Sequence, residues 1–524
     1  MKKKVNSLKG LRVMLAILFF IPVLLYFTDF RNQLPAAIAR SLHLQIIPAL
    51  LAGMVGVWVI QFVLALLFGR IYCSTICPAG ILQDIINRLF RIGKKKKKAK
   101  FRFTYHKPNN LLRYGLMTLT FGGAIAGLSE LCLVLDPYSN FGRIASSLFR
   151  PAAVWGNNLL AGLLARFDDY TLYHVSLTTV TTASLIAAGA ALAVFITMVA
   201  TRGRLFCNTL CPTGALLSLV SRFSFFRISI DKDKCNACGL CAKSCKAEAI
   251  DTETFTVDNS RCVDCFNCLS ACHRDSIRFV FEPFYGDLFK EVHSLTLERD
   301  SRPLERDSRR EFLATGATIA ASLPVLSALA QKTGGDEQPL PLTPPGSQSL
   351  QRFKAKCTAC HICVVQCPSH VLRPAGLQFG WRYLLKPHMA YTDSYCNYEC
   401  TVCADVCPNH AISLHGVEEK VTTQVGIAEF SINRCIVETE HTDCGACSEH
   451  CPTQAVHMVP YRDGSTLTVP RVEPELCIGC GGCESICPVR PRRAIIVKAN
   501  PVHQHVEKPA EEEALDVKVD DFGF

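Results

Sequence analysis

The pattern of apolar and polar positions separates an apolar first part of the chain from a later part made of short, cysteine-rich loops. Four stretches, 11–28, 46–68, 111–135 and 179–200, are almost free of charged residues. Each is close to the about 20 residues that cross a lipid bilayer. Buried core helices can look the same, but four such runs in so short a segment indicate a bundle of membrane helices. A fifth, milder apolar run covers 312–330.

Basic residues predict how this bundle is oriented. They crowd the N-terminus and the loop after the second apolar run, whereas the loops at 29–45 and 136–178 hold few of them. Because basic loops stay in the cytoplasm, the N-terminus and the chain near residue 201 are expected on the inner side. Topology and anionic lipid then account for the net charge of +11, and nucleic-acid binding is not expected. The inner basic residues include Lys2, Lys3, Lys4, Lys9, Arg12, Arg88, Arg91 and the run Lys94 to Lys98.

Two cysteine runs follow the fourth apolar segment, and each reads C-x2-C-x2-C-x3-C. In this pattern one loop gives three thiolates to a [4Fe-4S] cluster, and its fourth cysteine ligates the cluster of the partner loop. A zinc site would instead show paired C-x2-C knuckles. Lys246 and His273 stand where proline usually follows the fourth cysteine. The predicted ligand sets are Cys235, Cys238, Cys241 and Cys272 for one cluster, and Cys262, Cys265, Cys268 and Cys245 for the other.

Four more cysteine loops lie in the last third of the chain, and each ends in Cys-Pro. Short apolar pieces such as 411–414, 455–459 and 494–497 follow them, which indicates an internal repeat of a ferredoxin half-unit. The second and third loops have a widened first gap, and spacing alone leaves open which loop pairs with which. The loops are Cys357, Cys360, Cys363, Cys367; Cys396, Cys400, Cys403, Cys407; Cys435, Cys444, Cys447, Cys451; and Cys477, Cys480, Cys483, Cys487. Of the 29 cysteines, 24 would thus serve six [4Fe-4S] clusters, which predicts an electron wire.

A motif repeated at the ends of two apolar runs holds four further cysteines. Residues 69–80 read GRIYCSTICPAG, and residues 203–214 read GRLFCNTLCPTG. In a helix, cysteines four apart share a face, so the pairs Cys73 with Cys77 and Cys207 with Cys211 can converge. They are interpreted as an extra metal or cluster site, or as redox-active thiols; alternatively they are thiols that only pack. A permanent disulfide is not expected on a reducing side of the membrane.

The segment 307–331 has the features of a twin-arginine export signal. Arg309 and Arg310 precede an apolar stretch, and Ala328-Leu329-Ala330 resembles a cleavage site. This export route suits a domain that receives its clusters before it crosses the membrane. The expected domains are 1–225, a four-span membrane domain; 226–282, a cytoplasmic two-cluster domain; 283–350, a linker with the signal; 351–500, a periplasmic four-cluster domain; and 501–524, an acidic tail.

The fold class expected is therefore a polytopic α-helical membrane domain joined to α+β ferredoxin-like iron–sulfur domains. The protein is expected in a bacterial inner membrane with its C-terminal domain in the periplasm. Glu130, late in the third apolar run, is the catalytic candidate, because a carboxylate within a membrane segment is a functional site by default. It can accept a proton from quinol, or it can be a solvated residue at the interface. No G-x-G-x-x-G after a strand is present.

With these motifs, residues 1–282 resemble the NapH and MauN family of membrane ferredoxins, and residues 305–500 resemble the NapG and MauM family. The resemblance implies that the membrane part oxidises quinol from the membrane pool and that the exported part passes electrons to a periplasmic cytochrome or reductase. The chain would then be a quinol dehydrogenase component. The alternative is an accessory ferredoxin that matures or reactivates a metalloenzyme.

Overall fold

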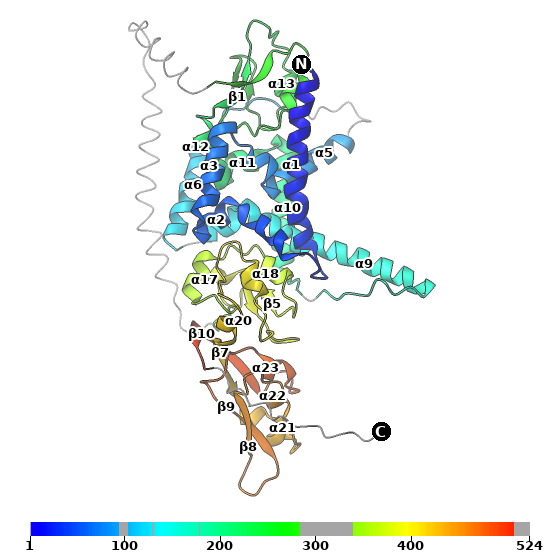
Figure 1. The fold of residues 1–524 in the computed structure, drawn as a ribbon, viewed down its shortest axis with the longest axis vertical. Coiled ribbons are helices and arrows are strands. Elements are labelled where there is room, and N and C mark those ends of the chain that lie inside the picture. The colour runs from blue at the N-terminus through cyan, green and yellow to red at the C-terminus, as the bar shows by residue number, and fades with distance from the viewer. Residues whose placement is uncertain (1, 94–102, 128–129, 178, 283–338, 508–524) are drawn as a thin grey trace, which may run out of the picture.

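The computed structural model describes residues 2–93, 103–127, 130–177, 179–282 and 339–507. Figure 1 shows an elongated molecule with a helical bundle in its middle. A small domain (residues 226–282) lies at one end of the bundle, beside the N-terminus. A large domain (residues 339–507) extends from the opposite end. The two cysteine-rich parts of the sequence are therefore separated by the apolar part.

The bundle is built from helices that range from one turn to membrane length. The long ones have few polar side chains, and α10 begins with a capping box in which Thr181 and Ser184 bond each other's backbone. The helices are α1 (Lys2–Thr28), η1 (Ala36–Leu44), α2 (Ile46–Ala52), α3 (Val55–Phe68), α4 (Tyr72–Thr75), α5 (Pro78–Gly93), α6 (Asn110–Ile125), α7 (Glu130–Leu135), α8 (Pro137–Ile144), η2 (Ala145–Phe149), α9 (Arg150–Leu164), η3 (Ala165–Phe167), α10 (Thr182–Arg202), α11 (Leu205–Thr209) and α12 (Pro212–Ser221).

Two of the four expected membrane spans are single helices of sufficient length. Ser7–Thr28 within α1 and Thr182–Arg202 meet the criteria of length and apolar composition among the described residues. The other two runs are interrupted. The run 46–68 breaks at Gly53, whose left-handed φ of 75° ends α2, and the run 111–135 is divided between α6 and α7. Apolarity along the sequence did not reveal these breaks, because they depend on one or two residues.

Helix α8 joins the bundle to the large domain, and all of its residues are buried. The side chain of Asp136 caps its first turn by accepting hydrogen bonds from the backbone of Tyr138 and Ser139. Pro137 occupies the first turn, where its missing N–H costs nothing. The rings of Phe20 and Phe27 of α1 pack edge-on against Phe141 of α8.

The small domain is a compact unit of short strands and two one-turn helices. Strands β1 and β4 pair antiparallel, as do β2 and β3. Each helix carries the third cysteine of one cysteine run, Cys241 in α13 and Cys268 in α14. The elements are β1 (Phe226–Ile230), α13 (Leu240–Ser244), β2 (Ile250–Asp251), β3 (Thr256–Val257), α14 (Asn267–Ala271) and β4 (Ile277–Phe281).

The large domain repeats this arrangement of cysteine loop, short helix and strand. Its pairs are all antiparallel: β5 with β6, β7 with β10, and β8 with β9. The elements are α17 (Leu350–Lys356), α18 (Ile362–Val365), β5 (Leu372–Pro374), η4 (Trp381–Tyr383), β6 (Pro387–Met389), α19 (Val402–Asp405), α20 (Val417–Val421), β7 (Thr423–Phe430), η5 (Ile432–Arg434), α21 (Ile436–Thr439), α22 (Ala446–Glu449), β8 (Val456–Pro460), β9 (Thr468–Val472), α23 (Gly482–Ile486) and β10 (Ile495–His505).

The boundaries of the large domain are wider than the expected 351–500. Strand β10 continues to His505, so the residues after Pro501 do not all belong to a tail. The segment before residue 351 is not a free linker either, because Thr343 and Ser347 are buried. The Thr343 hydroxyl bonds the His503 ring at 2.9 Å. Proline and serine content indicated a linker, but here these residues pack as a strap beside β10. The twin-arginine segment and the tail from residue 508 lie outside the described residues.

Candidate iron–sulfur sites and their connections

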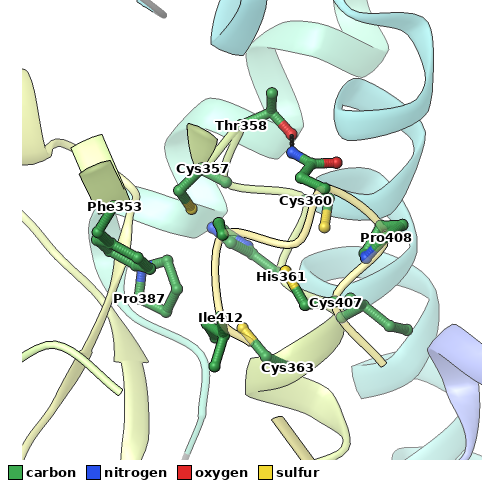
Figure 2. Close-up of a pocket in the computed structure, with 14 residues that line it drawn as sticks. Phe353, Cys357, Thr358, Cys360, His361, Cys363, Pro387, Cys407, Pro408 and Ile412 are labelled. Atoms are coloured by element: carbon green, nitrogen blue, oxygen red, sulfur yellow. Dashed lines mark hydrogen bonds between the residues drawn. The ribbon is translucent and has the colours of Figure 1, made fainter. Parts of the chain in front are cut away.

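The cysteines of the large domain gather into four sites, each formed by two loops. Figure 2 shows one, in which Cys407 joins three cysteines of an earlier loop around a pocket. Pocket lining and electrostatic interactions between thiols define the four sets. Site A is Cys357, Cys360, Cys363 and Cys407; site B is Cys396, Cys400, Cys403 and Cys367; site C is Cys435, Cys444, Cys447 and Cys487; and site D is Cys477, Cys480, Cys483 and Cys451.

These sets answer the question that loop spacing left open. The first loop exchanges its fourth cysteine with the second loop, and the third exchanges with the fourth. The small domain follows the same rule at site E, where Cys262, Cys265 and Cys268 line one pocket with Cys245. At site F, Cys241 interacts with Cys235 and Cys238; Cys272 as its fourth member stays a prediction.

The backbone of the cysteine loops turns sharply at residues with left-handed φ angles. Ala237, Asp264, Ala359 and Gly479 each precede the second cysteine of a loop and have positive φ. Such turns point successive N–H groups toward a common centre, which suits an anionic ligand. The two loops with a widened first gap are not in this set.

The four thiols of site A are all buried. Burial raises the pKa values of all four thiols, and the pKa of Cys357 is raised to about 11. His361 lies in the same pocket, where burial and the charge of Arg143 lower its pKa to about 3. Four thiolates this close need bound cations, and the iron atoms of a cluster supply them. The donor set therefore fits a [4Fe-4S] cluster, which carries one electron at a time when bound.

Among the described residues, no group of three or more His, Cys, Asp or Glu side chains could hold a single metal ion.

The sites of the large domain form a row. Cys396 of site B donates its backbone N–H to the Cys480 carbonyl of site D at 3.0 Å, and their thiols also interact. Cys447 of site C interacts with Cys483 of site D. The order from the bundle outward is therefore A, B, D, C, which differs from the order of the loops along the chain.

Site A lies directly against the bundle. Ser139 of α8 donates a hydrogen bond to the Thr358 hydroxyl at 2.8 Å. Gln366 donates a hydrogen bond to the Tyr26 carbonyl, near the end of α1, at 2.8 Å. At Gly142 of α8 a Cβ atom would lie 2.4 Å from the Cys360 carbonyl oxygen. Glycine at this position allows the helix to approach the cluster loop so closely.

Replacing Gly142 by Ala is expected to loosen this contact. The methyl group would clash with the Cys360 carbonyl and lie 2.9 Å from the Phe27 ring, so the domains must separate, at a cost of about 1–3 kcal/mol. Thermal unfolding of the full chain measures the effect. Gly156→Ala on α9 is the matched control, because nothing lies within 4 Å of its Cβ position. Equal melting curves for both variants would contradict close packing at Gly142.

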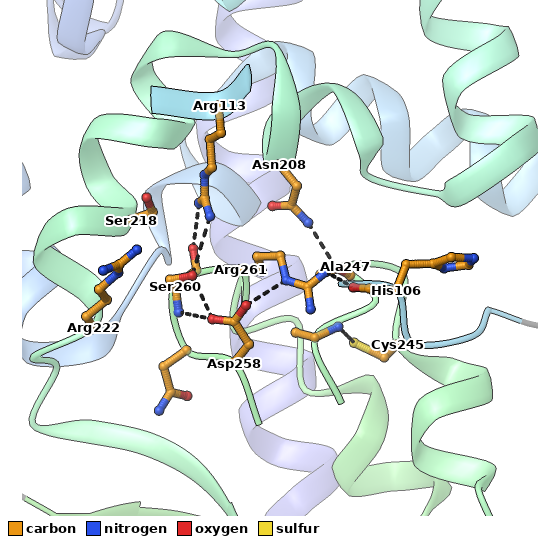
Figure 3. A network of polar contacts seen from close by, with 12 residues as sticks. His106, Arg113, Asn208, Ser218, Arg222, Cys245, Ala247, Asp258, Ser260 and Arg261 are labelled. Atoms are coloured by element: carbon orange, nitrogen blue, oxygen red, sulfur yellow. Dashed lines mark hydrogen bonds and ion pairs between the residues drawn. The ribbon is translucent and has the colours of Figure 1, made fainter. Parts of the chain in front are cut away.

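The small domain contacts the bundle through a polar network (Figure 3). Arg113 of α6 donates to the Ser260 carbonyl at 2.7 Å, two residues before Cys262 of site E. Asn208 donates to the Ala247 carbonyl at 2.9 Å, two residues after Cys245 of the same site. Site E, rather than site F, is thus the member of this pair that lies nearer the bundle.

The two repeated motifs meet inside the bundle and bring four buried thiols together. Each of these thiols interacts electrostatically with the other three. Arg70 of the first motif donates to the Cys207 carbonyl at 2.8 Å, and Arg204 of the second motif donates to the Cys73 carbonyl at 2.5 Å. The motifs are therefore related by an approximate two-fold arrangement. This twin-motif site is Cys73, Cys77, Cys207 and Cys211.

The glycine that ends each motif makes this crossing possible. A Cβ at Gly80 would lie 2.2 Å from the Cys73 carbonyl oxygen, and one at Gly214 would lie 2.3 Å from the Cys207 carbonyl oxygen. The sequence repeat contains these glycines and arginines. Its spacing did not show that each arginine donates a hydrogen bond to a carbonyl of the opposite motif.

Lys246, which replaces the usual proline after Cys245, has a role in this region. Its ammonium group lies 2.5 Å from a carboxylate oxygen of Asp84, and its carbonyl accepts a hydrogen bond from the backbone of Arg204. Asp84 was not singled out from the sequence, because a lone acidic residue on α5 gives no signal without its partners.

Glu130 begins α7 and lies beside the large domain. Its carboxylate interacts with Lys354 and Lys386, and one of its oxygen atoms is buried without a hydrogen bond. Lys386 interacts with Cys357 of site A as well. Glu130 is therefore close to site A.

Cys132, the remaining cysteine, is buried in α7.

Family models of iron–sulfur domains match five stretches of the chain. A 4Fe-4S binding domain matches residues 50–98 and 182–231, which hold the repeated motifs. 4Fe-4S dicluster domains match residues 227–273, 356–412 and 442–490. These matches confirm several ferredoxin-type iron–sulfur domains, and the class that they define is that of iron–sulfur electron-transfer proteins.

Individual proteins with similar sequences include ferredoxin-type proteins. An uncharacterized protein of Methanocaldococcus jannaschii, MJ0749, is 25% identical over 275 residues, 52% of this chain and 88% of that protein. The ferredoxin-type protein NapG of Escherichia coli is 28% identical over 201 residues, 36% of this chain and 85% of its own. The ferredoxin-type protein NapF of the same organism is 28% identical over 149 residues, 28% of this chain and 80% of its own. No solved structure matches.

Proposed function

We propose that the chain is a multi-pass inner-membrane protein that takes electrons from quinol and delivers them to a periplasmic cytochrome or reductase. It would combine a NapH/MauN-type membrane ferredoxin with a NapG/MauM-type exported ferredoxin. The observation that carries the proposal is the row of cysteine sites, which continues on both sides of an apolar bundle.

Helix α1 supports the membrane placement because it touches both cysteine-rich domains. The Lys9 ammonium group lies 3.5 Å from the Ser270 hydroxyl of the small domain, and the Tyr26 carbonyl accepts a hydrogen bond from Gln366 of the large domain. These contacts are separated by about 26 Å along the helix axis, close to the thickness of the hydrocarbon layer. The large domain would face the periplasm, which agrees with the twin-arginine motif before it.

Glu130 is proposed to receive a proton when quinol is oxidised. Oxidation releases two electrons and two protons. The electrons would enter at site A and leave one at a time through sites B, D and C, which belong to the six [4Fe-4S] clusters that sites A to F would hold. The carboxylate lies near site A, where a quinol in the bundle would give up its electrons.

The test uses anaerobically purified full chain and a soluble quinol analogue. Quinol should reduce the clusters, and Glu130→Gln should slow that reduction about a hundredfold, the typical contribution of a general base. Chemical reduction by dithionite should be unchanged. Glu253→Gln, which changes an exposed carboxylate of the small domain, is the matched control. Clusters that stay oxidised in excess quinol would reject the dehydrogenase and favour the accessory ferredoxin.

A further inference from the structure

Helix α9 leaves the bundle sideways and exposes apolar side chains along one face. Figure 1 shows it projecting from the junction between the bundle and the large domain, across the direction of α1. Residues 151–165 contain no charged side chain. The buried residues of the helix recur at intervals of three or four positions and form the opposite face. The exposed face consists of Trp155, which is 69% exposed, and Leu159, Leu160 and Leu163.

Hydrogen bonds tie α9 to the same end of both candidate membrane spans. Arg31, three residues beyond the end of α1, donates to the Asn157 side chain at 3.2 Å. The Arg31 guanidinium also lies over the Tyr173 ring, 5.2 Å from its centre. At the start of α9, Arg150 donates to the hydroxyl of Thr179, three residues before α10 begins, at 3.0 Å. Helix α9 therefore lies at the level where α1 ends and α10 begins.

The polar side chains of α9 are paired with the chain segment that follows the helix. Asn158 donates to the Val175 carbonyl and accepts a hydrogen bond from the Val175 backbone, both at 2.9 Å. Asn157 donates to the Tyr173 carbonyl at 3.0 Å. Figure 1 shows this return segment along α9 on the side of the large domain. The amides are thus satisfied within the protein, and the exposed face of the helix offers only apolar contacts.

Aromatic side chains accompany this face. Phe167 is 82% exposed, and the rings of Tyr170 and Tyr173 in the return segment are also exposed. Tryptophan and tyrosine are enriched where a membrane meets water, because their rings are apolar at one end and polar at the other. An apolar helix face that lies in the plane of a membrane is buried in the boundary between headgroups and acyl chains.

We propose that α9 lies in the headgroup region of the periplasmic leaflet, with Trp155, Leu159 and Leu163 turned toward the acyl chains of phospholipids. This inference rests on the membrane placement in the proposed function. A spanning helix of a partner protein would run along α1 and cross α9 at one point. A lipid surface can instead cover the whole length of α9, which is about 22 Å.

The position of α9 gives this contact a consequence for the relay. Helix α9 follows α8 and η2 directly along the chain, and α8 packs against the Cys360 loop of site A. Fixing α9 at the membrane surface therefore fixes the depth of site A as well. A donor dissolved in the lipid would meet site A at a constant height.

Photocrosslinking in native membranes tests the proposal without quinol. Full chain in which Trp155 is replaced by p-benzoylphenylalanine should give a phospholipid adduct on irradiation, detected by mass spectrometry. The same replacement at Val194, an exposed residue in the middle of α10, is the positive control, and at Trp381 of the large domain it is the negative control. An adduct at Val194 without one at Trp155 would overturn the interfacial helix and keep the membrane placement. A crosslink from Trp155 to another polypeptide would also overturn it, and no adduct at either position would reject the membrane placement too.

A pair of variants tests whether the apolar face makes the contact. Leu159→Glu with Leu163→Glu should abolish the lipid adduct at position 155, because two carboxylates cannot enter the acyl region. Leu159→Ile with Leu163→Ile is the matched control and should retain the adduct. Both side chains are exposed, so the fold and the iron content should stay unchanged in both variants. An undiminished adduct in the glutamate variant would contradict the proposal.

Discussion

Replacing Cys360 by Ser is expected to stop electrons from quinol reaching the rest of the large domain. Cys360 is one of four thiols of site A, the only one of sites A to D that contacts α8 in the described residues. Site A is therefore the expected entry point for electrons that pass from the bundle to sites B, D and C. Loss of an outer partner of a metal ligand already costs about 10–100-fold in activity, so loss of a ligand should cost more. Freeze-quench EPR after mixing with quinol measures the reduction.

Cys444→Ser at site C is the matched control for this variant. Site C lies at the far end of the row, so quinol should still reduce sites A, B and D at the normal rate. Only transfer to a soluble acceptor should fail. If Cys360→Ser allows the outer sites to be reduced at the rate of the unmodified protein, the order A, B, D, C is wrong as a path for electrons.

Replacing Arg309 and Arg310 together by Lys is expected to leave the large domain in the cytoplasm. These residues lie outside the described part of the chain, so this prediction comes from the motif alone. A retained domain cannot reach the end of the bundle where α8 lies, and activity with periplasmic acceptors should fall to background. Protease accessibility in spheroplasts reports the location of residues 339–507.

Arg302→Lys with Arg306→Lys is the control for export. It makes the same chemical change a few residues earlier and spares the motif. Normal export in the control together with retention in the Arg309 and Arg310 variant supports the signal. Full export in both would remove the twin-arginine interpretation, and with it the expected placement of the large domain.

The cysteine loops could be predicted because ligation dictates their spacing. Three cysteines of one loop and a fourth from another are a local requirement, and loops such as 262–272 display it directly. Which loops exchange a cysteine could not be predicted, because that depends on tertiary packing. In the structure, Cys407 of the second loop completes site A, and Cys487 of the fourth loop completes site C. The order A, B, D, C of the sites depends on these exchanges between loops.

Helix breaks in the bundle and the boundaries of the large domain could not be predicted from the pattern of apolar and polar residues. A run of apolar residues gives length, but the break at Gly53 follows from one backbone angle. The strap around Thr343 looks like a linker until its contact with His503 is known. Arg70 and Arg204 were visible as part of a repeat, yet their crossed contacts arise only when the two motifs face each other.

The most direct test of the relay is electron transfer across a sealed membrane. The full chain would be placed in proteoliposomes that contain quinol in the lipid, with the large domain outward and a membrane-impermeant electron acceptor outside. The account predicts that the acceptor is reduced at a rate set by the protein, two electrons for each quinol consumed, and that Cys444→Ser abolishes the reaction. Oxidised clusters and an unreduced acceptor in the presence of excess quinol would contradict it.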